Sequence, residues 1–189
     1  KFLIIKKINM VLKCFKSYDI RGEIGTEIDE RICYLIGRSF AEVLDTKNVV
    51  VGQDSRASSP DFANAVIKGL IDEGSNVLSI GLSGTEEMYW ATTEFEACGG
   101  IHVTASHNPI NFNGLKMVKA GSAPLHPISE FKEIEKAVEK NSFINKGLKG
   151  KFFEKSEQAR NAYVKKILTF VDCEKIKPLK MLVNSGNGA

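Results

Sequence analysis

Several polar residues in this sequence carry the side chains that phosphoryl transfer requires. They lie in three clusters, residues 17–22 (SYDIRG), 53–56 (QDSR) and 104–109 (TASHNP), and at Lys116. Together they offer a hydroxyl nucleophile, a phenol, two arginines, a lysine and a histidine. A transferring phosphoryl group spreads negative charge over its oxygens, so arginine, lysine and a metal ion stabilise it. Since a serine hydroxyl can hold the group covalently, the residue set suits this chemistry.

The same residues also have structural interpretations. Ser106 and Asn108 are turn formers in front of Pro109, and the pattern alone favours a hydrogen-bonded turn there. His107 could be a structural hydrogen-bonding residue. For the others the structural alternatives are surface ion pairs at Arg21 and Arg56, a cap at Asp54, an exposed strand lysine at Lys116 and a half-buried ring at Tyr18. The residue types alone therefore indicate an α/β domain with a candidate anion site.

The elements that would position these clusters alternate along the chain. Hydrophobic spacing predicts helices over 28–44, 60–71, 85–95, 128–139 and 156–170, and strands over 48–51, 77–80, 100–105 and 115–118. Strands that alternate with helices indicate a layered α/β domain with a largely parallel sheet. In such sheets ligands gather at the carboxyl ends of the strands, where several of the polar clusters fall.

Local signals predict the ends of three of these elements. Thr26 with Asp29 resembles a capping box at the start of the first helix. Ser59 is expected to cap the second helix, with Pro60 at its first position and Gly74 just past its end. The Asn-Gly pair in residues 111–114 predicts a turn between two antiparallel strands. The sheet is therefore expected to be mixed.

Composition limits the classes of partner. The chain has 189 residues and a net charge of +3, with 26 basic and 23 acidic residues spread along it. Because no block of like charge stands out, we expect no nucleic-acid partner, while an anionic small molecule still fits. The four cysteines form no CxxC pair, which argues against a zinc site or a disulfide framework and suits a reducing cytosol. No feature of the sequence specifies an oligomeric state.

The two ends of the chain suggest its organisation. The apolar start is interrupted by Lys6 and Lys7, and no stretch approaches the roughly 20 apolar residues that span a bilayer. We therefore expect a cytoplasmic protein with no membrane partner. Residues 1–9 are expected to be an N-terminal extension ahead of Met10, and residues 10–155 to form one domain. Residues 141–155 lose helical periodicity, as a linker or edge hairpin would, and 156–189 are expected to be the truncated start of a second domain, with a strand at 181–183 and a turn at 185–188.

Taken together, the clusters resemble the α-D-phosphohexomutase family. The motifs YDIRG (18–22), GQDSR (52–56), TASHNP (104–109) and NGLKM (113–117) match the family's motifs in the right order, and the resemblance covers about residues 14–189. Residues 82–87 (LSGTEE) look most like bacterial phosphomannomutases. The resemblance implies a three-layer α/β/α domain with a mixed, mostly parallel sheet. It also implies a hexose phosphate substrate, mannose 6-phosphate or mannose 1-phosphate, in a pathway that feeds GDP-mannose.

The resemblance assigns a role to each candidate residue. Ser106 would carry the phosphoryl group, and Mg²⁺ would bridge a phosphoserine oxygen to an aspartate loop that this chain lacks. The other implied roles are proton transfer and charge stabilisation for Lys116 and Arg21, shaping of the site for Tyr18, loop and phosphoserine contacts for His107 and Asn108, and loop support for Asp54 and Arg56. Gln53 replaces the arginine that is common in the family.

Two other functions stay open at this point. One keeps the family and changes the sugar, as in a phosphoglucomutase or a phosphoglucosamine mutase. The other is a non-catalytic module that binds a phosphosugar. Because the family's metal loop and sugar-recognition loops are missing from these 189 residues, we expect the chain alone to be inactive as a mutase.

Overall fold

The structure is a computed structural model that describes residues 12–144, 147 and 149–184. Its centre is a single sheet in the order β1 (Ile20–Glu23), β5 (Phe112–Lys119), β4 (Gly99–Val103), β2 (Asn48–Gln53), β3 (Asn76–Leu82) and β7 (Phe152–Glu154), with the short β6 (Ala123–Pro124) paired to β5. Strand β5 is antiparallel to β1, β4 and β6, whereas the β4–β2, β2–β3 and β3–β7 pairs are parallel. The prediction of a mixed, mostly parallel sheet is confirmed.

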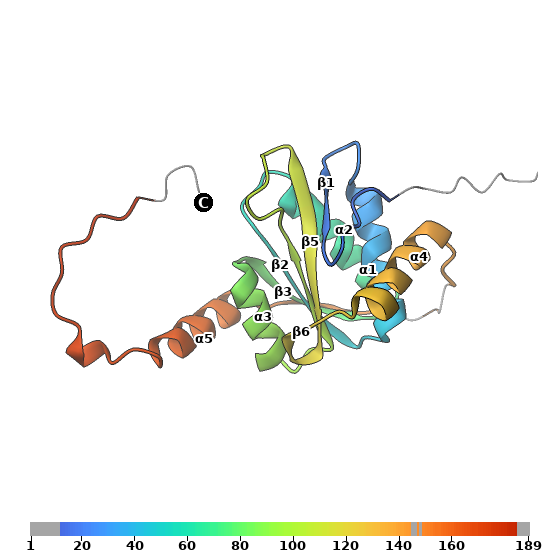
Figure 1. Ribbon diagram of the computed structural model, residues 1–189. Coiled ribbons are helices and arrows are strands. Elements are labelled where there is room, and N and C mark those ends of the chain that lie inside the picture. Colours follow the sequence, from blue (N-terminus) through green and yellow to red (C-terminus); the bar gives the residue numbers. More distant parts are fainter. Residues whose placement is uncertain (1–11, 145–146, 148, 185–189) are drawn as a thin grey trace, which may run out of the picture.

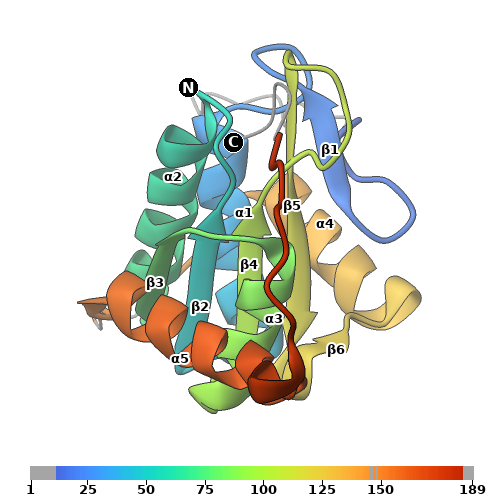
Figure 2. The ribbon, with the colours of Figure 1, turned by 90° about the vertical axis from the view of Figure 1, so that its left-hand side faces the viewer.

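Helices cover both faces of this sheet. Helices α1 (Glu30–Leu44), α2 (Ser59–Asp72) and α4 (Lys132–Lys140) lie on one face, and α3 (Thr85–Glu94) and α5 (Ser156–Leu168) lie on the other (Figures 1 and 2). Each face has its own apolar core: Phe40 and Phe62 pack with Leu115 on the first, and Met88 packs with Val50 on the second. The described residues also form three short helices, η1 (Ala120–Ser122), η2 (Pro127–Phe131) and η3 (Cys173–Lys175). The α/β/α layering matches the prediction.

The structure corrects the predicted N-terminal caps of both α1 and α2. Asp29 alone caps α1, because its Oδ1 accepts a bond of 2.7 Å from the Ile32 N–H, while the Thr26 hydroxyl contacts Glu23. The predicted capping box is therefore wrong. The residue before α2 is Ser58, and Ser59 is the first helical residue. The Ser59 hydroxyl does not cap the helix but donates to the carboxylate of Asp54.

The predicted turn at 111–114 is also wrong. Asn113 and Gly114 lie inside β5, opposite Gly22 and Arg21 of β1, a strand that the sequence pattern did not reveal. Neither residue has the positive φ that an Asn-Gly hairpin turn requires. Instead, the fully buried Asn113 amide donates to the Ser58 and Ser59 hydroxyls at the start of α2. The β4–β5 connection is the earlier segment 104–111, which we name the serine loop.

The C-terminal part contains an edge strand at 152–154 and differs from the prediction at 181–183. Residues 152–154 form the edge strand β7, which pairs parallel to β3. The predicted strand at 181–183 is absent: Met181, Leu182 and Val183 are 79%, 97% and 86% exposed and pair with no strand among the described residues. Helix α5 packs on β3 and α3. The domain boundary after residue 155 stays a prediction, and the predicted extension at 1–9 and turn at 185–188 lie outside the described residues.

Candidate active site around the serine loop

The serine loop leaves the carboxyl end of β4 and holds Ser106 at an exposed position. Ser106 has φ 55°, the left-handed region, which costs a residue other than glycine about 1–2 kcal/mol. Its N–H donates a bond of 2.9 Å to the Thr104 hydroxyl. The Ser106 hydroxyl itself forms no hydrogen bond with any residue that the structure describes. The loop therefore presents a free hydroxyl on a backbone that its surroundings hold in a costly conformation.

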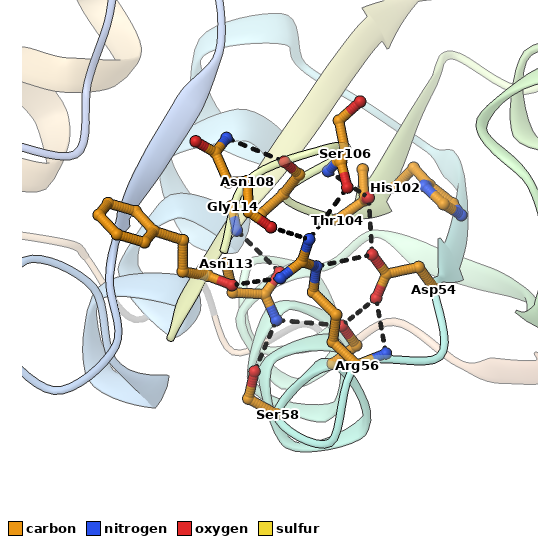
Figure 3. A network of polar contacts seen from close by, with 12 residues as sticks. Asp54, Arg56, Ser58, His102, Thr104, Ser106, Asn108, Asn113 and Gly114 are labelled. Atoms are coloured by element: carbon orange, nitrogen blue, oxygen red, sulfur yellow. Dashed lines mark hydrogen bonds and ion pairs between the residues drawn. The ribbon is translucent and has the colours of Figure 1, made fainter. Parts of the chain in front are cut away.

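Arg56 supplies most of that support. Its Nη1 donates to the carbonyl oxygens of Pro109 (2.8 Å) and Phe112 (3.1 Å), and its Nη2 donates to those of Ser106 (2.9 Å) and Asn108 (2.7 Å) (Figure 3). The guanidinium is thus bound to three carbonyls of the loop and to that of Phe112 at the start of β5. Because these donors are occupied, the geometry favours loop support over direct phosphate binding by Arg56.

Asp54 ties the loop to the sheet and to α2. One carboxylate oxygen accepts the Ser59 hydroxyl at 2.5 Å and the Arg56 N–H at 3.0 Å. The other accepts the Thr104 hydroxyl at 2.7 Å and lies 3.4 Å from Arg56 Nε. The Asn113 amide extends this network, since it donates to Ser59 as well (Figure 3). The sequence analysis did not place Thr104, Ser59 or Asn113 at the site, because the contacts of Thr104 with Asp54 and of Asn113 with Ser59 span 50 and 54 positions.

The two other candidate residues of the loop differ in their contacts. The Asn108 side chain donates to the Ala105 carbonyl at 3.0 Å, and its N–H bonds to the same oxygen at 3.1 Å. His107 is exposed. Asn108 therefore shapes the loop, whereas the His107 ring is accessible to a ligand.

Lys116 and Tyr18 lie in a neighbouring pocket. This pocket has a volume of about 350 Å³, and Asp19, Tyr89 and Leu125 also line it. Tyr18 is 75% exposed, and the Lys116 ammonium has no hydrogen-bond or ion-pair partner among the residues that the structure describes. A cation without a fixed partner, beside a phenol and an open pocket, is suited to an anionic ligand.

Arg21 adjoins this pocket through an ion pair. Its Nη2 lies 2.7 Å from Asp19 Oδ2, and its backbone pairs with Gly114 in β5. The structure therefore brings the candidate residues together in two neighbouring groups joined by β5. The serine loop and its support include Ser106, His107, Asn108, Asp54 and Arg56. Tyr18 and Lys116 line the pocket, and Arg21 contacts it through Asp19.

A buried histidine lies between these groups and was missed by the sequence analysis. His102 pairs with Lys116 across β4 and β5 and is 1% exposed. Its Nε2 lies 3.0 Å from the Ser83 carbonyl oxygen, which needs a donor, so Nδ1 at 3.2 Å accepts from the Thr85 hydroxyl. Burial lowers the pKa of His102 below its ordinary value. The only signal in the sequence was a histidine inside an otherwise apolar strand.

The lowered pKa of His102 makes the stability of the domain depend on pH. In the unfolded chain His102 binds a proton near its ordinary pKa of 6.5, whereas in the folded protein it binds one only at lower pH. The free energy of unfolding therefore falls as pH drops below about 6.5. Asp54, Glu86 and Lys116 act on the same ring. Urea unfolding at about pH 7.5 and about pH 5.5 should show this loss, and His102→Gln, which does not titrate, should reduce it. An equal loss in the variant would contradict the assignment to His102.

The chain is similar to known proteins in both sequence and structure. Residues 12–145 match the family described as phosphoglucomutase/phosphomannomutase, alpha/beta/alpha domain I. The chain is 45% identical over 183 residues to a phosphomannomutase of Vibrio cholerae serotype O1, covering 94% of this chain and 39% of that protein. It is 42% identical over 180 residues to a phosphomannomutase of Escherichia coli K12, again covering 94% and 39%.

A shorter relative and a solved structure agree with these matches. A Klebsiella pneumoniae phosphomannomutase is 48% identical over 132 residues, covering 70% of this chain and 84% of that protein. The crystal structure of a phosphoglucomutase/phosphomannomutase family protein from Burkholderia thailandensis superimposes with a TM-score of 0.72 at 31% identity, over 85% of this chain and 36% of that one. The chain spans about 39% of the length of the first relatives.

Proposed function

Because the chain belongs to the phosphoglucomutase/phosphomannomutase family, we propose that it carries the catalytic serine of a phosphomannomutase. The reaction would interconvert mannose 6-phosphate and mannose 1-phosphate through a phosphoserine and a bisphosphorylated sugar. One observation carries the proposal: Ser106 presents a free hydroxyl on a left-handed backbone that Arg56 holds through four carbonyl oxygens. A simple turn would need no such support. The names of the similar proteins support mannose as the sugar.

The proposed reaction has two phosphoryl transfers, and Ser106 takes part in both. Phosphorylated Ser106 would give its phosphoryl group to a hydroxyl of the bound hexose monophosphate: the Oγ–P bond breaks, a new sugar O–P bond forms, the sugar hydroxyl loses its proton to a base, and Ser106 Oγ takes up a proton from an acid. The bisphosphorylated sugar then turns over and returns its other phosphoryl group to Ser106. Lys116 and Arg21 would stabilise charge and assist proton transfer, which agrees with the free ammonium of Lys116 in its pocket. Tyr18 would shape this pocket, and His107 and Asn108 would contact the phosphoserine.

Mg²⁺ is the cofactor that we propose for this chemistry. The described residues contain no group of three or more His, Cys, Asp or Glu side chains that could hold a metal ion. The phosphoryl oxygens on Ser106 would therefore be the ligands from this part of the chain, and carboxylate ligands would come from elsewhere in the protein. Oxygen donors of this type suit Mg²⁺. When bound, Mg²⁺ neutralises the charge that develops on the phosphoryl oxygens.

We further propose a cytoplasmic enzyme in a pathway that leads to GDP-mannose. The described cysteines are free, as a reducing compartment would keep them. Among the helices of the described residues, none has the length and apolar character to cross a membrane. The hexose phosphate is the proposed partner, and residues 156–189 are proposed to begin a second domain that the full-length protein completes.

The proposal is tested by assaying the full-length protein that contains this chain on mannose 6-phosphate, glucose 6-phosphate and glucosamine 6-phosphate. We expect kcat/KM to be highest for mannose 6-phosphate, by about tenfold or more, because a site that hydrogen-bonds particular hydroxyls rejects other arrangements. The 189-residue chain alone should show no turnover. Preference for another sugar would support a phosphoglucomutase or phosphoglucosamine mutase, and binding without turnover would support a phosphosugar-binding module.

A further inference from the structure

Thr104 makes two hydrogen bonds that join the serine loop to Asp54. Its hydroxyl donates to Asp54 Oδ2 at 2.7 Å and accepts the Ser106 N–H at 2.9 Å (Figure 3). The residue is buried, with 7% of its surface exposed, and its own N–H is fixed by the Gly114 carbonyl oxygen at 2.9 Å. The hydroxyl is thus held on both sides at the root of the loop.

The direction of these bonds is determined by their partners. A hydroxyl has one proton, and an ionised carboxylate can only accept, so the proton of Thr104 points to Asp54. Its lone pairs are then directed to the Ser106 amide. A bond to a charged carboxylate is stronger than a neutral one and polarises the next bond in the chain. The negative charge of Asp54 therefore strengthens the hold on the Ser106 N–H.

The hydrogen bond from the Ser106 N–H to Thr104 also affects the Ser106 side chain, which would react. Ser106 keeps φ 55°, and the direction of its Oγ depends on that backbone conformation. Arg56 binds the carbonyl side of Ser106, and Thr104 binds its amide side. We propose that Thr104 is a positioning residue for phosphoryl transfer, whose hydroxyl fixes the Ser106 amide so that Oγ keeps one reactive direction. This inference rests on the proposed function of Ser106.

The test removes the hydroxyl without changing the shape of the side chain. Thr104→Val in the full-length protein should lower the single-turnover rate of phosphoryl transfer from a hexose bisphosphate to Ser106 by about 10–100-fold, since about 1.4 kcal/mol corresponds to tenfold. The KM for the bisphosphate should change little, because neither Thr104 nor its two partners, Asp54 and Ser106, line the pocket. Thr104→Ser keeps the hydroxyl and should restore most of the rate. If Thr104→Val does not fold, Thr104→Ala carries the same test.

Thr92 provides a matched control for the loss of a buried hydroxyl. It is fully buried in α3, and its hydroxyl donates to the Met88 carbonyl, away from the serine loop. Thr92→Val should reduce stability without slowing phosphoryl transfer. A Thr104→Val rate equal to that of the parent would overturn the inference and leave the proposed function intact. A parent protein that accepts no phosphoryl group on Ser106 would instead overturn the proposed function.

A second readout does not depend on phosphorylation. In the 189-residue chain, the Ser106 amide proton should exchange with solvent faster in Thr104→Val than in the parent, because its acceptor is gone. Thr104→Ser should retain the slower exchange. Equal exchange in all three proteins would contradict the hydrogen bond on which the inference depends.

Discussion

Ser106→Ala in the full-length protein is expected to abolish acceptance of a phosphoryl group from a hexose bisphosphate. The intact mass of the parent should increase by one phosphoryl group in the presence of Mg²⁺, while the variant should show no increase. Loss of a covalent nucleophile removes the pathway itself, so the rate should fall by about 10³-fold or more. Since Ser106 is exposed and its hydroxyl is not bonded to any other described residue, the unfolding free energy should change by no more than about 0.5 kcal/mol.

Ser55 provides the control for this experiment. It is an exposed serine between Asp54 and Arg56, close to the loop but not part of it. Ser55→Ala should accept the phosphoryl group as the parent does. If Ser106→Ala gained the same mass as the parent, another residue would be the acceptor and Ser106 would be a turn residue after all.

Arg56→Ala is expected to impair both the reaction and the fold of the loop. The guanidinium is largely buried, with 15% of its side chain exposed, and it satisfies three carbonyl oxygens of the loop and that of Phe112 at the start of β5. Its removal leaves these carbonyls and Asp54 without their cation, at a cost of about 2–4 kcal/mol in unfolding free energy. The single-turnover rate of Ser106 phosphorylation should fall by about 10²-fold. Denaturant unfolding and rapid-quench kinetics measure the two effects.

Two further variants separate the geometry of Arg56 from its charge. Arg56→Lys keeps the positive charge but lacks the planar fork, so it should recover only a small part of the lost rate. Arg31→Ala removes an exposed arginine on α1 and should leave both quantities unchanged. Full activity in Arg56→Lys would indicate that charge, rather than the fork, supports the loop.

The sequence was informative where structure depends on neighbouring residues. The 3.6-residue period of apolar side chains predicted α1 and α2 nearly to their ends, because each helix buries one face whatever the details of its partners. Gly74, with φ 100°, ends α2 as predicted, since this conformation is favoured by glycine. The order of the motifs also pointed to Ser106, Lys116 and Arg21 as site residues, and their roles stay a prediction.

Errors occurred where a distant residue decides the local conformation. The Asn113-Gly114 pair is typical of a turn, but Ser58 and Ser59, more than 50 positions earlier, bind the Asn113 amide and keep it in a strand. The contacts of Arg56 with the serine loop also span 50–56 positions. A pattern within a short window carries no information on such partners. For the same reason, His102 could not be distinguished from an ordinary strand residue.

The contacts of Arg56 also constrain how the serine loop can evolve. Surface loops usually accept insertions and deletions more readily than the elements that they connect. Here one rigid fork binds the carbonyls of residues 106, 108, 109 and 112, so an added or lost residue would move at least one of them out of reach. Side chains at positions such as the exposed Ile110 can change freely, because only the backbone is bound. Natural variants should therefore differ at positions such as 110, while the number of residues in the loop stays constant.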